Sequence, residues 1–161
     1  MIVCLDVDYR VTSVVTACVG FGEWTDATAA REHVVRSAAA AAAYEPGRFF
    51  ERELPYLRAA LASFAEPIEL AIVDGYVWLA DGVPGLGAHL HDAIGVPVVG
   101  VAKTAYAGSN AIPIVRGESA SPLFVTAVGI PARVAADHVI AMHGPYRIPT
   151  LLKRADTLAR G

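Results

Sequence analysis

Three acidic residues occur at positions where they could hold a divalent cation together. Asp6 ends one short apolar run, Asp74 ends a second from Leu70 to Val73, and Glu53 lies in a helix-like stretch between them. A carboxylate at the end of a buried strand is costly to desolvate unless a shared cation pairs with it. A magnesium ion held there could activate water and stabilise an in-line displacement at phosphorus. The alternative is that Asp6 caps a turn, Asp74 forms an Asx-turn and Glu53 is solvated.

Three further residues have side chains that suit the same chemistry. Lys103 ends another apolar run and could contact a phosphate or orient the attacking water, or lie as an extended lysine at a sheet edge. Tyr44 could stack on a nucleic-acid base or pack in the core. Asp8 lies two residues after Asp6, on the same strand face, where we expect it at the rim of the site with a second cation or a water.

Composition limits the classes of protein that these residues can belong to. The chain of 161 residues is most simply one domain, residues 1–161, and its 55% hydrophobic content argues against disorder. A net charge of -3 argues against a strong non-specific nucleic-acid binder, but not against an enzyme whose acids bind cations. Cys4 and Cys18 lie in apolar runs, which favours buried thiols in a reducing compartment. The sequence shows neither a signal segment nor an apolar stretch long enough to span a membrane, so we expect a cytoplasmic protein.

The pattern of apolar residues predicts alternating strands and helices. We expect strands at 2–8, 11–21, 33–43, 70–73, 96–101 and 122–128, and helices at 49–64, 85–94, 133–142 and 151–159. This order predicts an α/β, ribonuclease H-like fold, with a mixed sheet of five or more strands, an antiparallel edge and flanking helices. If the strands of Asp6 and Asp74 are parallel neighbours about 4.8 Å apart, their carboxylates can share a cation, with Glu53 reaching down to it.

Several motifs in this order resemble the endonuclease V family, whose members act as deoxyinosine-type endonucleases. The resemblance extends over nearly the whole chain. Its motifs are Leu5-Asp6-Val7-Asp8-Tyr9, Tyr44-Glu45-Pro46-Gly47 with Arg52-Glu53, Val73-Asp74-Gly75, Gly87-Ala88-His89-Leu90, Val96 to Thr104, Tyr146-Arg147-Ile148-Pro149 and Arg154-Ala155-Asp156.

This resemblance implies a nuclease that uses Mg²⁺, with Mn²⁺ as a possible substitute, to cleave phosphodiesters near deaminated bases such as inosine in DNA or RNA. It would assign Asp6, Glu53 and Asp74 to the metal, with Lys103 as a further catalytic residue. Tyr44 would be a wedge against the bases. The other substrate-binding positions would be Pro46, Gly47 and Gly75.

Departures from the family pattern leave a second function open. The family has a His shortly after the strand at 122–128, and that His is missing here, although Asp137 or His138 could replace it. The His-Pro-Arg of many members is replaced by Ala80-Asp81-Gly82, and the usual N-terminal extension is absent. The chain is therefore expected to be a short nuclease with weakened activity, or else a relative that binds nucleic acid or a partner protein without cutting. Retention of three acids favours the nuclease.

Overall fold

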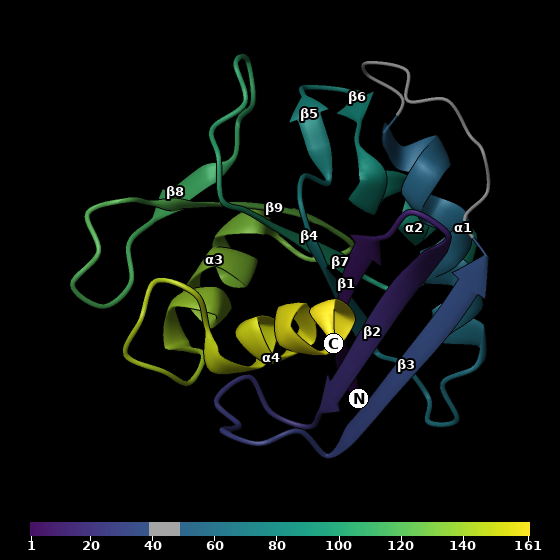
Figure 1. The fold of residues 1–161 in the computed structure, drawn as a ribbon. Coiled ribbons are helices and arrows are strands. Elements are labelled where there is room, and N and C mark those ends of the chain that lie inside the picture. The colour runs from purple at the N-terminus through teal and green to yellow at the C-terminus, as the bar shows by residue number, and fades with distance from the viewer. Residues whose placement is uncertain (39–48) are drawn as a thin grey trace.

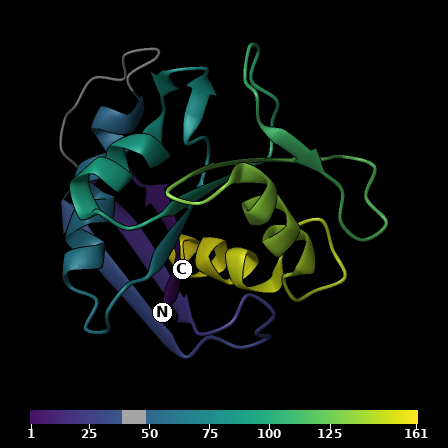
Figure 2. The same cartoon turned by 180° about the vertical axis from the view of Figure 1, so that it is seen from behind.

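The computed structural model describes residues 1–38 and 49–161, which form a mixed sheet of seven strands with helices on both faces, and a separate small hairpin (Figure 1, Figure 2). The strands of the large sheet are β1 (Ile2–Tyr9), β2 (Ser13–Phe21), β3 (Arg31–Ala38), β4 (Leu70–Asp74), β7 (Val98–Ala102), β8 (Ile112–Ile114) and β9 (Leu123–Val128). The hairpin consists of β5 (Trp78–Ala80) and β6 (Val83–Pro84).

The strand order β3-β2-β1-β4-β7-β9-β8 combines a parallel centre with antiparallel edges. β1 pairs in parallel with β4, and β4 with β7, whereas the β1–β2, β2–β3, β7–β9 and β8–β9 pairs are antiparallel. The continuous apolar sequences of β4 and β7 suit strands that are buried on both faces. The predicted ribonuclease H-like fold is therefore confirmed.

Two pairs of helices cover the two faces of the sheet. α1 (Phe49–Ala62) and α2 (Leu86–Ile94) lie on one face, where Leu57 and Leu90 pack against Val3, Ala71 and Val98. α3 (Ala132–Ala141) and α4 (Thr150–Arg160) lie on the other face, where their apolar side chains pack against alternate residues of the same strands. Among the residues that the structure describes, no helix combines the length and apolar character needed to cross a bilayer.

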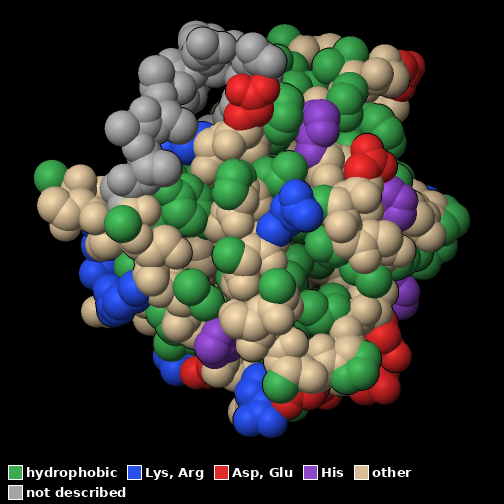
Figure 3. Space-filling model, turned by 90° about the vertical axis from the view of Figure 1, so that its right-hand side faces the viewer, with side chains coloured by type: hydrophobic (Ala, Val, Ile, Leu, Met, Phe, Trp, Pro, Cys, Tyr) green, Lys and Arg blue, Asp and Glu red, His purple; other side chains and the backbone are tan. Residues whose placement is uncertain are grey.

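Seen from the side on which α1 lies, the surface is largely hydrophobic and uncharged, with charged side chains in small, separate groups (Figure 3). A hollow of about 710 Å³ on this part of the molecule is lined by residues of α1 between Pro55 and Ala62, by Phe64, Glu66 and Ile68, and by Ala93, Ile94 and Val96. None of the acids predicted to bind a metal lines it.

The helices and longer strands match the predicted elements to within a few residues, but three short strands were not predicted. β5, β6 and β8 have only two or three residues each, too few for an alternating pattern, and Pro84 and Pro113 interrupt two of them. The third strand was expected at 33–43. The structure has β3 at Arg31–Ala38, and the rest of the expected strand, beyond Ala38, lies outside the described residues.

A close approach of the chain behind Asp74 depends on Gly100 in the middle of β7. A Cβ atom at this glycine would lie 2.5 Å from the carbonyl oxygen of Gly75, 2.8 Å from Thr126 Oγ1 and 2.9 Å from the amide nitrogen of Val77. The Val77 amide donates a hydrogen bond to that Oγ1 at 2.8 Å. The absence of a side chain at Gly100 therefore lets the segment after β4 pass directly over β7.

Candidate active site

The register of the central strands places two acids at matching positions. Leu5 of β1 lies opposite Val73 of β4, and the next residues along these parallel strands are Asp6 and Asp74. Ile2, Cys4, Leu70 and Ile72, which alternate with their neighbours, belong to the cluster beneath α3 and α4. By the same alternation, the two aspartates have their side chains on the α4 face of the sheet. The parallel arrangement expected from the sequence is confirmed.

Glu53 comes from α1, on the opposite face, and is only 7% exposed. Its Oε2 atom is buried and has no hydrogen-bond partner. The pKa of Glu53 is raised to about 8, first by burial and then by the negative charges of Asp6 and Asp74, with Arg52 opposing them. Burial also raises the pKa of Asp6 to about 6, with Asp74 as the second cause. The three acids from both sides of the sheet are thus electrostatically coupled.

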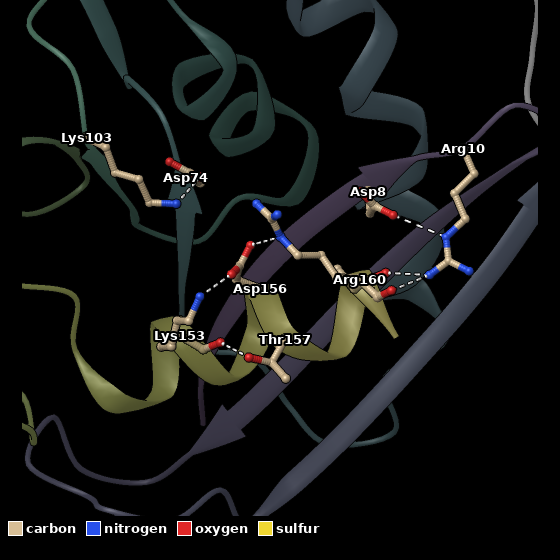
Figure 4. A network of polar contacts seen from close by, with 9 residues as sticks. Asp8, Arg10, Asp74, Lys103, Lys153, Asp156, Thr157 and Arg160 are labelled. Atoms are coloured by element: carbon tan, nitrogen blue, oxygen red, sulfur yellow. Dashed lines mark hydrogen bonds and ion pairs between the residues drawn. The ribbon is translucent and has the colours of Figure 1, made fainter.

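Asp156 is a fourth acid of this site and comes from α4, which packs on β1 and β2. It is 8% exposed, and its charge adds to the rise in the pKa of Asp6. Lys153 Nζ donates to its Oδ2 at 2.7 Å and Arg160 Nε to its Oδ1 at 2.6 Å (Figure 4). These two hydrogen bonds, that from Lys153 foremost, lower the pKa of Asp156 to about 2.

Asp156 belongs to a family motif, Arg154-Ala155-Asp156, but was not predicted among the acids of the site. The signal for it was the helix pattern: Leu151, Ala155 and Ala159 form the buried face of α4, and Asp156 lies beside that face, four residues after the partly buried Leu152. An acid next to the apolar stripe of a helix loses much of its hydration when the helix packs, and it therefore needs a polar partner.

A cavity of about 220 Å³ lies between the sheet and α4 and is lined by Asp6, Asp74 and Asp156, but not by Glu53. Apolar side chains that include Cys4, Ile72 and Leu152 line part of it. Three acids and four cationic side chains also line the cavity. They are Asp6, Asp74, Asp156, Lys103, Arg147, Lys153 and Arg160. The space therefore offers both signs of charge beside an apolar wall, which suits an anionic ligand together with cations.

Lys103, which directly follows β7, lines this cavity. Its Nζ contacts Asp74 Oδ2 at 3.1 Å, and both side chains are close to half exposed (Figure 4). Arg147 holds the backbone beneath it, because its Nη2 donates to the Lys103 carbonyl at 2.6 Å and to the Pro122 carbonyl at 2.9 Å. Gly75 follows Asp74 with a φ of 137°, a conformation that side chains disfavour.

The structure places the predicted accessory residues in other contacts. Arg10 Nε lies 3.1 Å from Asp8 Oδ2, so Arg10 balances the charge of Asp8 (Figure 4). The Nη2 atom of the same arginine donates to the Arg160 carbonyl at the end of α4. Asp137 pairs with Arg133 at 3.3 Å, and His138 stacks on Trp24 at 4.7 Å. Neither of the two lines the cavity. Tyr44, Pro46 and Gly47 lie outside the described residues.

The oxygen donors fit a hard divalent cation such as magnesium or manganese in chemistry. The unpartnered Oε2 of Glu53 and the raised pKa values of Glu53 and Asp6 indicate carboxyl groups whose ionised form the described residues stabilise poorly, and which a bound cation would stabilise. Among the described residues, no three His, Cys, Asp or Glu side chains already form a closed metal-binding cluster. The salt bridges on Asp74 and Asp156 would have to open before those oxygens could bind a cation.

Fold and site together define a ribonuclease H-like protein with acids at matching positions of two parallel strands, Asp6 within β1 and Asp74 at the carboxyl end of β4. The profile of the endonuclease V family matches residues 1–136, and the chain belongs to this family. The resemblance drawn from its motifs is thereby confirmed.

Two curated relatives are Endonuclease V of Streptomyces avermitilis, 33% identical over 138 residues, and Endonuclease V of Streptomyces coelicolor, 32% identical over 138 residues. The matches cover 73% of this chain in both cases, and 60% and 59% of the relatives. The chain therefore matches about three fifths of the length of these proteins.

Solved structures agree on the fold. The S. avermitilis Endonuclease V structure superposes with a TM-score of 0.78 at 30% identity, over 99% of this chain and 79% of that one. Endonuclease V of Ciona intestinalis, solved with a 24mer DNA containing an inosine followed by a ribo-adenosine, gives a TM-score of 0.82 at 17% identity, over 99% and 83%.

Proposed function

We propose that this protein is a metal-dependent endonuclease that hydrolyses a phosphodiester near a deaminated base, such as inosine, in DNA or RNA. The observation that carries the proposal is that the negative charges of Asp6, Glu53 and Asp74 act on one another, although burial of Asp6 and Glu53 is costly. The S. avermitilis and S. coelicolor relatives, which are 33% and 32% identical to it over 138 residues, are endonucleases V by name.

In this proposal, Asp6, Glu53, Asp74 and Asp156 hold the cation, Mg²⁺ or Mn²⁺, through carboxylate oxygens. When bound, such an ion polarises the phosphate and lowers the pKa of a coordinated water. Lys103 exchanges its salt bridge with Asp74 for a contact to a phosphate oxygen or to the attacking water. Arg147 keeps the Lys103 backbone in place during this exchange. Tyr44, Pro46, Gly47 and Gly75 are proposed to contact the bases.

A second candidate function is binding of nucleic acid without cleavage. The observation that favours it is that Asp74 and Asp156 are both held in salt bridges, at 3.1 Å and at 2.6 to 2.7 Å. Protein cations then occupy oxygens that a metal would need. In this reading the cavity binds a strand through its cationic side chains, and the acids have only a structural role.

Cleavage assays separate the two functions. Strands of DNA and RNA that contain one inosine are incubated with the protein and either Mg²⁺ or Mn²⁺, next to identical strands with guanosine at that position. The nuclease predicts cuts near the inosine alone and only with metal. Binding of the inosine strands with no cut in either metal would instead establish the non-cutting function.

A further inference from the structure

An aromatic ring and a guanidinium group meet beside the acids. Tyr9 is the last residue of β1, three residues after Asp6, and Arg52 directly precedes Glu53 in α1. The Cζ atom of Arg52 lies over the ring of Tyr9, 4.0 Å from the ring centroid. A cation at this distance from the face of a tyrosine is attracted by the ring quadrupole.

The ring of Tyr9 is fixed by packing. Val3 and Leu5, which alternate with Asp6 along β1, face α1, and Tyr9 shares their side of the strand. The ring meets Tyr56 edge to face, with centroids 6.1 Å apart and planes at 80°. Its hydroxyl is buried and has no hydrogen-bond partner. Ring contacts, and not the hydroxyl, therefore hold this side chain.

Arg52 is the cation on the Glu53 side of the site. Its charge opposes the rise in the pKa of Glu53, so it lies close enough to that carboxylate to act on it. Lys103, by contrast, is on the Asp74 side and Arg160 on the Asp156 side. A phosphate that approaches the acids from the α1 side needs a cation there, and a guanidinium can bind two of its oxygens at once.

We propose that Tyr9 is a positioning residue for Arg52, whose guanidinium it holds over its ring so that Arg52 contacts a phosphate of the nucleic-acid strand beside Glu53. This inference rests on the proposed function, because it requires that the strand enters the acidic site. It assigns the ring, and not the phenol, as the functional part of Tyr9.

The test replaces Tyr9 by phenylalanine and then by mono-, di- and trifluorinated phenylalanine. This series keeps the shape of the ring but weakens its quadrupole step by step. Affinity for an inosine-containing single strand is measured at several salt concentrations, with Ca²⁺ in place of Mg²⁺ and Mn²⁺ to fill the oxygen ligands, and gels check that the strand stays uncut. Arg52→Gln is measured in parallel. Arg133→Gln, in the exposed α3 salt bridge, removes the same charge elsewhere and serves as the control.

We expect Tyr9→Phe to bind like wild type, and affinity to fall along the fluorinated series by about threefold to tenfold in total. Arg52→Gln should reduce the slope of log affinity against log salt by about 0.7, the value of one phosphate contact on a single strand. Arg133→Gln should leave the slope unchanged. The trifluorinated variant should approach the slope of Arg52→Gln.

Equal affinities along the fluorinated series would overturn the role of Tyr9, and an unchanged salt slope in Arg52→Gln would overturn the phosphate contact. Both results leave the proposed nuclease intact if the wild-type protein still cuts inosine strands. Failure of the wild-type protein to bind the strand would overturn the proposed function and this inference with it.

Discussion

Glu53 is an acid of the site with a strongly raised pKa, of about 8, against about 6 for Asp6. Asp74 has Lys103, and Asp156 has Lys153 and Arg160, whereas Glu53 Oε2 is buried without a hydrogen bond. With a pKa of about 8, Glu53 is largely protonated at neutral pH when no metal is bound. Metal binding therefore has to displace a proton from this residue, which makes metal affinity increase with pH.

The raised pKa of Glu53 predicts how stability of the metal-free protein depends on pH. The unfolded chain releases this proton near the ordinary value of 4.5, but the folded protein keeps it up to about 8. The folded state binds more protons in between, so the free energy of unfolding should fall as pH rises from about 5 to 8. Asp6, with a pKa of about 6, adds to the fall over the lower part of this range.

Urea unfolding in chelator at a series of pH values measures this slope. Glu53→Gln should flatten it and make the protein more stable than wild type at pH 8, on the order of 1 kcal/mol or more. Glu118→Gln, at an exposed position, is the matched control and should keep the wild-type slope. A wild-type protein whose stability rises from pH 5 to 8 would contradict the assigned burial of Glu53.

At the scale of elements, the sequence was most informative where strands are long and continuously apolar. The runs that became β1, β4 and β7 predicted parallel neighbours, and hence matching positions for Asp6 and Asp74. The short strands β5, β6 and β8 carry no such pattern, since they depend on contacts with distant segments.

In the candidate site too, a residue whose role depends on distant contacts was not predicted. Asp156 lies three residues after Lys153 and four before Arg160, a spacing that is typical of ordinary salt bridges on a helix surface. Only the packing of α4 on β1 and β2 places that acid near Asp6. The assignment of Asp6, Glu53, Asp74 and Lys103 to catalysis, which came from motifs, stays a prediction.

The crossing of the segment after β4 over β7 gives a prediction at this scale. Gly100→Ala adds a Cβ atom where backbone atoms of Gly75 and Val77 lie within 3 Å. We expect the free energy of unfolding to fall by about 1–3 kcal/mol and cleavage to weaken, because the end of β4 moves with Asp74. Urea unfolding and the cleavage assay measure the two effects.

Gly22→Ala is the control for this substitution, since a Cβ atom there meets only Asp26 Oδ2, at 3.7 Å. It should change stability by less than about 0.5 kcal/mol. If Gly100→Ala proved as stable as Gly22→Ala, the close approach would not hold Asp74 in position.

For the molecule as a whole, the net charge of -3 means that cations, and not a basic surface, have to draw nucleic acid to the site. The site has acids from β1, β4, α1 and α4 but no closed metal cluster within the described residues. Mg²⁺ demands near-octahedral geometry, whereas Mn²⁺ accepts less regular ligand sets. We therefore expect cleavage to be faster with Mn²⁺ than with Mg²⁺ at equal concentration.

The same preference should appear without substrate. Ligands that bind only the folded state raise the melting temperature, so Mn²⁺ should raise it more than Mg²⁺ at equal millimolar concentration. Differential scanning fluorimetry measures both shifts. If Mg²⁺ raised the melting temperature more than Mn²⁺ and also supported faster cleavage, the protein would have a preformed octahedral site in place of the open arrangement described above.

The central claim, that Asp6, Glu53 and Asp74 bind a catalytic metal, is tested most directly by Asp74→Asn. This substitution keeps the shape of the side chain but removes the charge that a cation needs. On an inosine-containing strand with Mn²⁺, we expect wild type to cut next to the inosine and Asp74→Asn to lose at least about 100-fold in rate, with an unchanged circular dichroism spectrum. Equal cleavage by the two proteins would contradict the metal assignment.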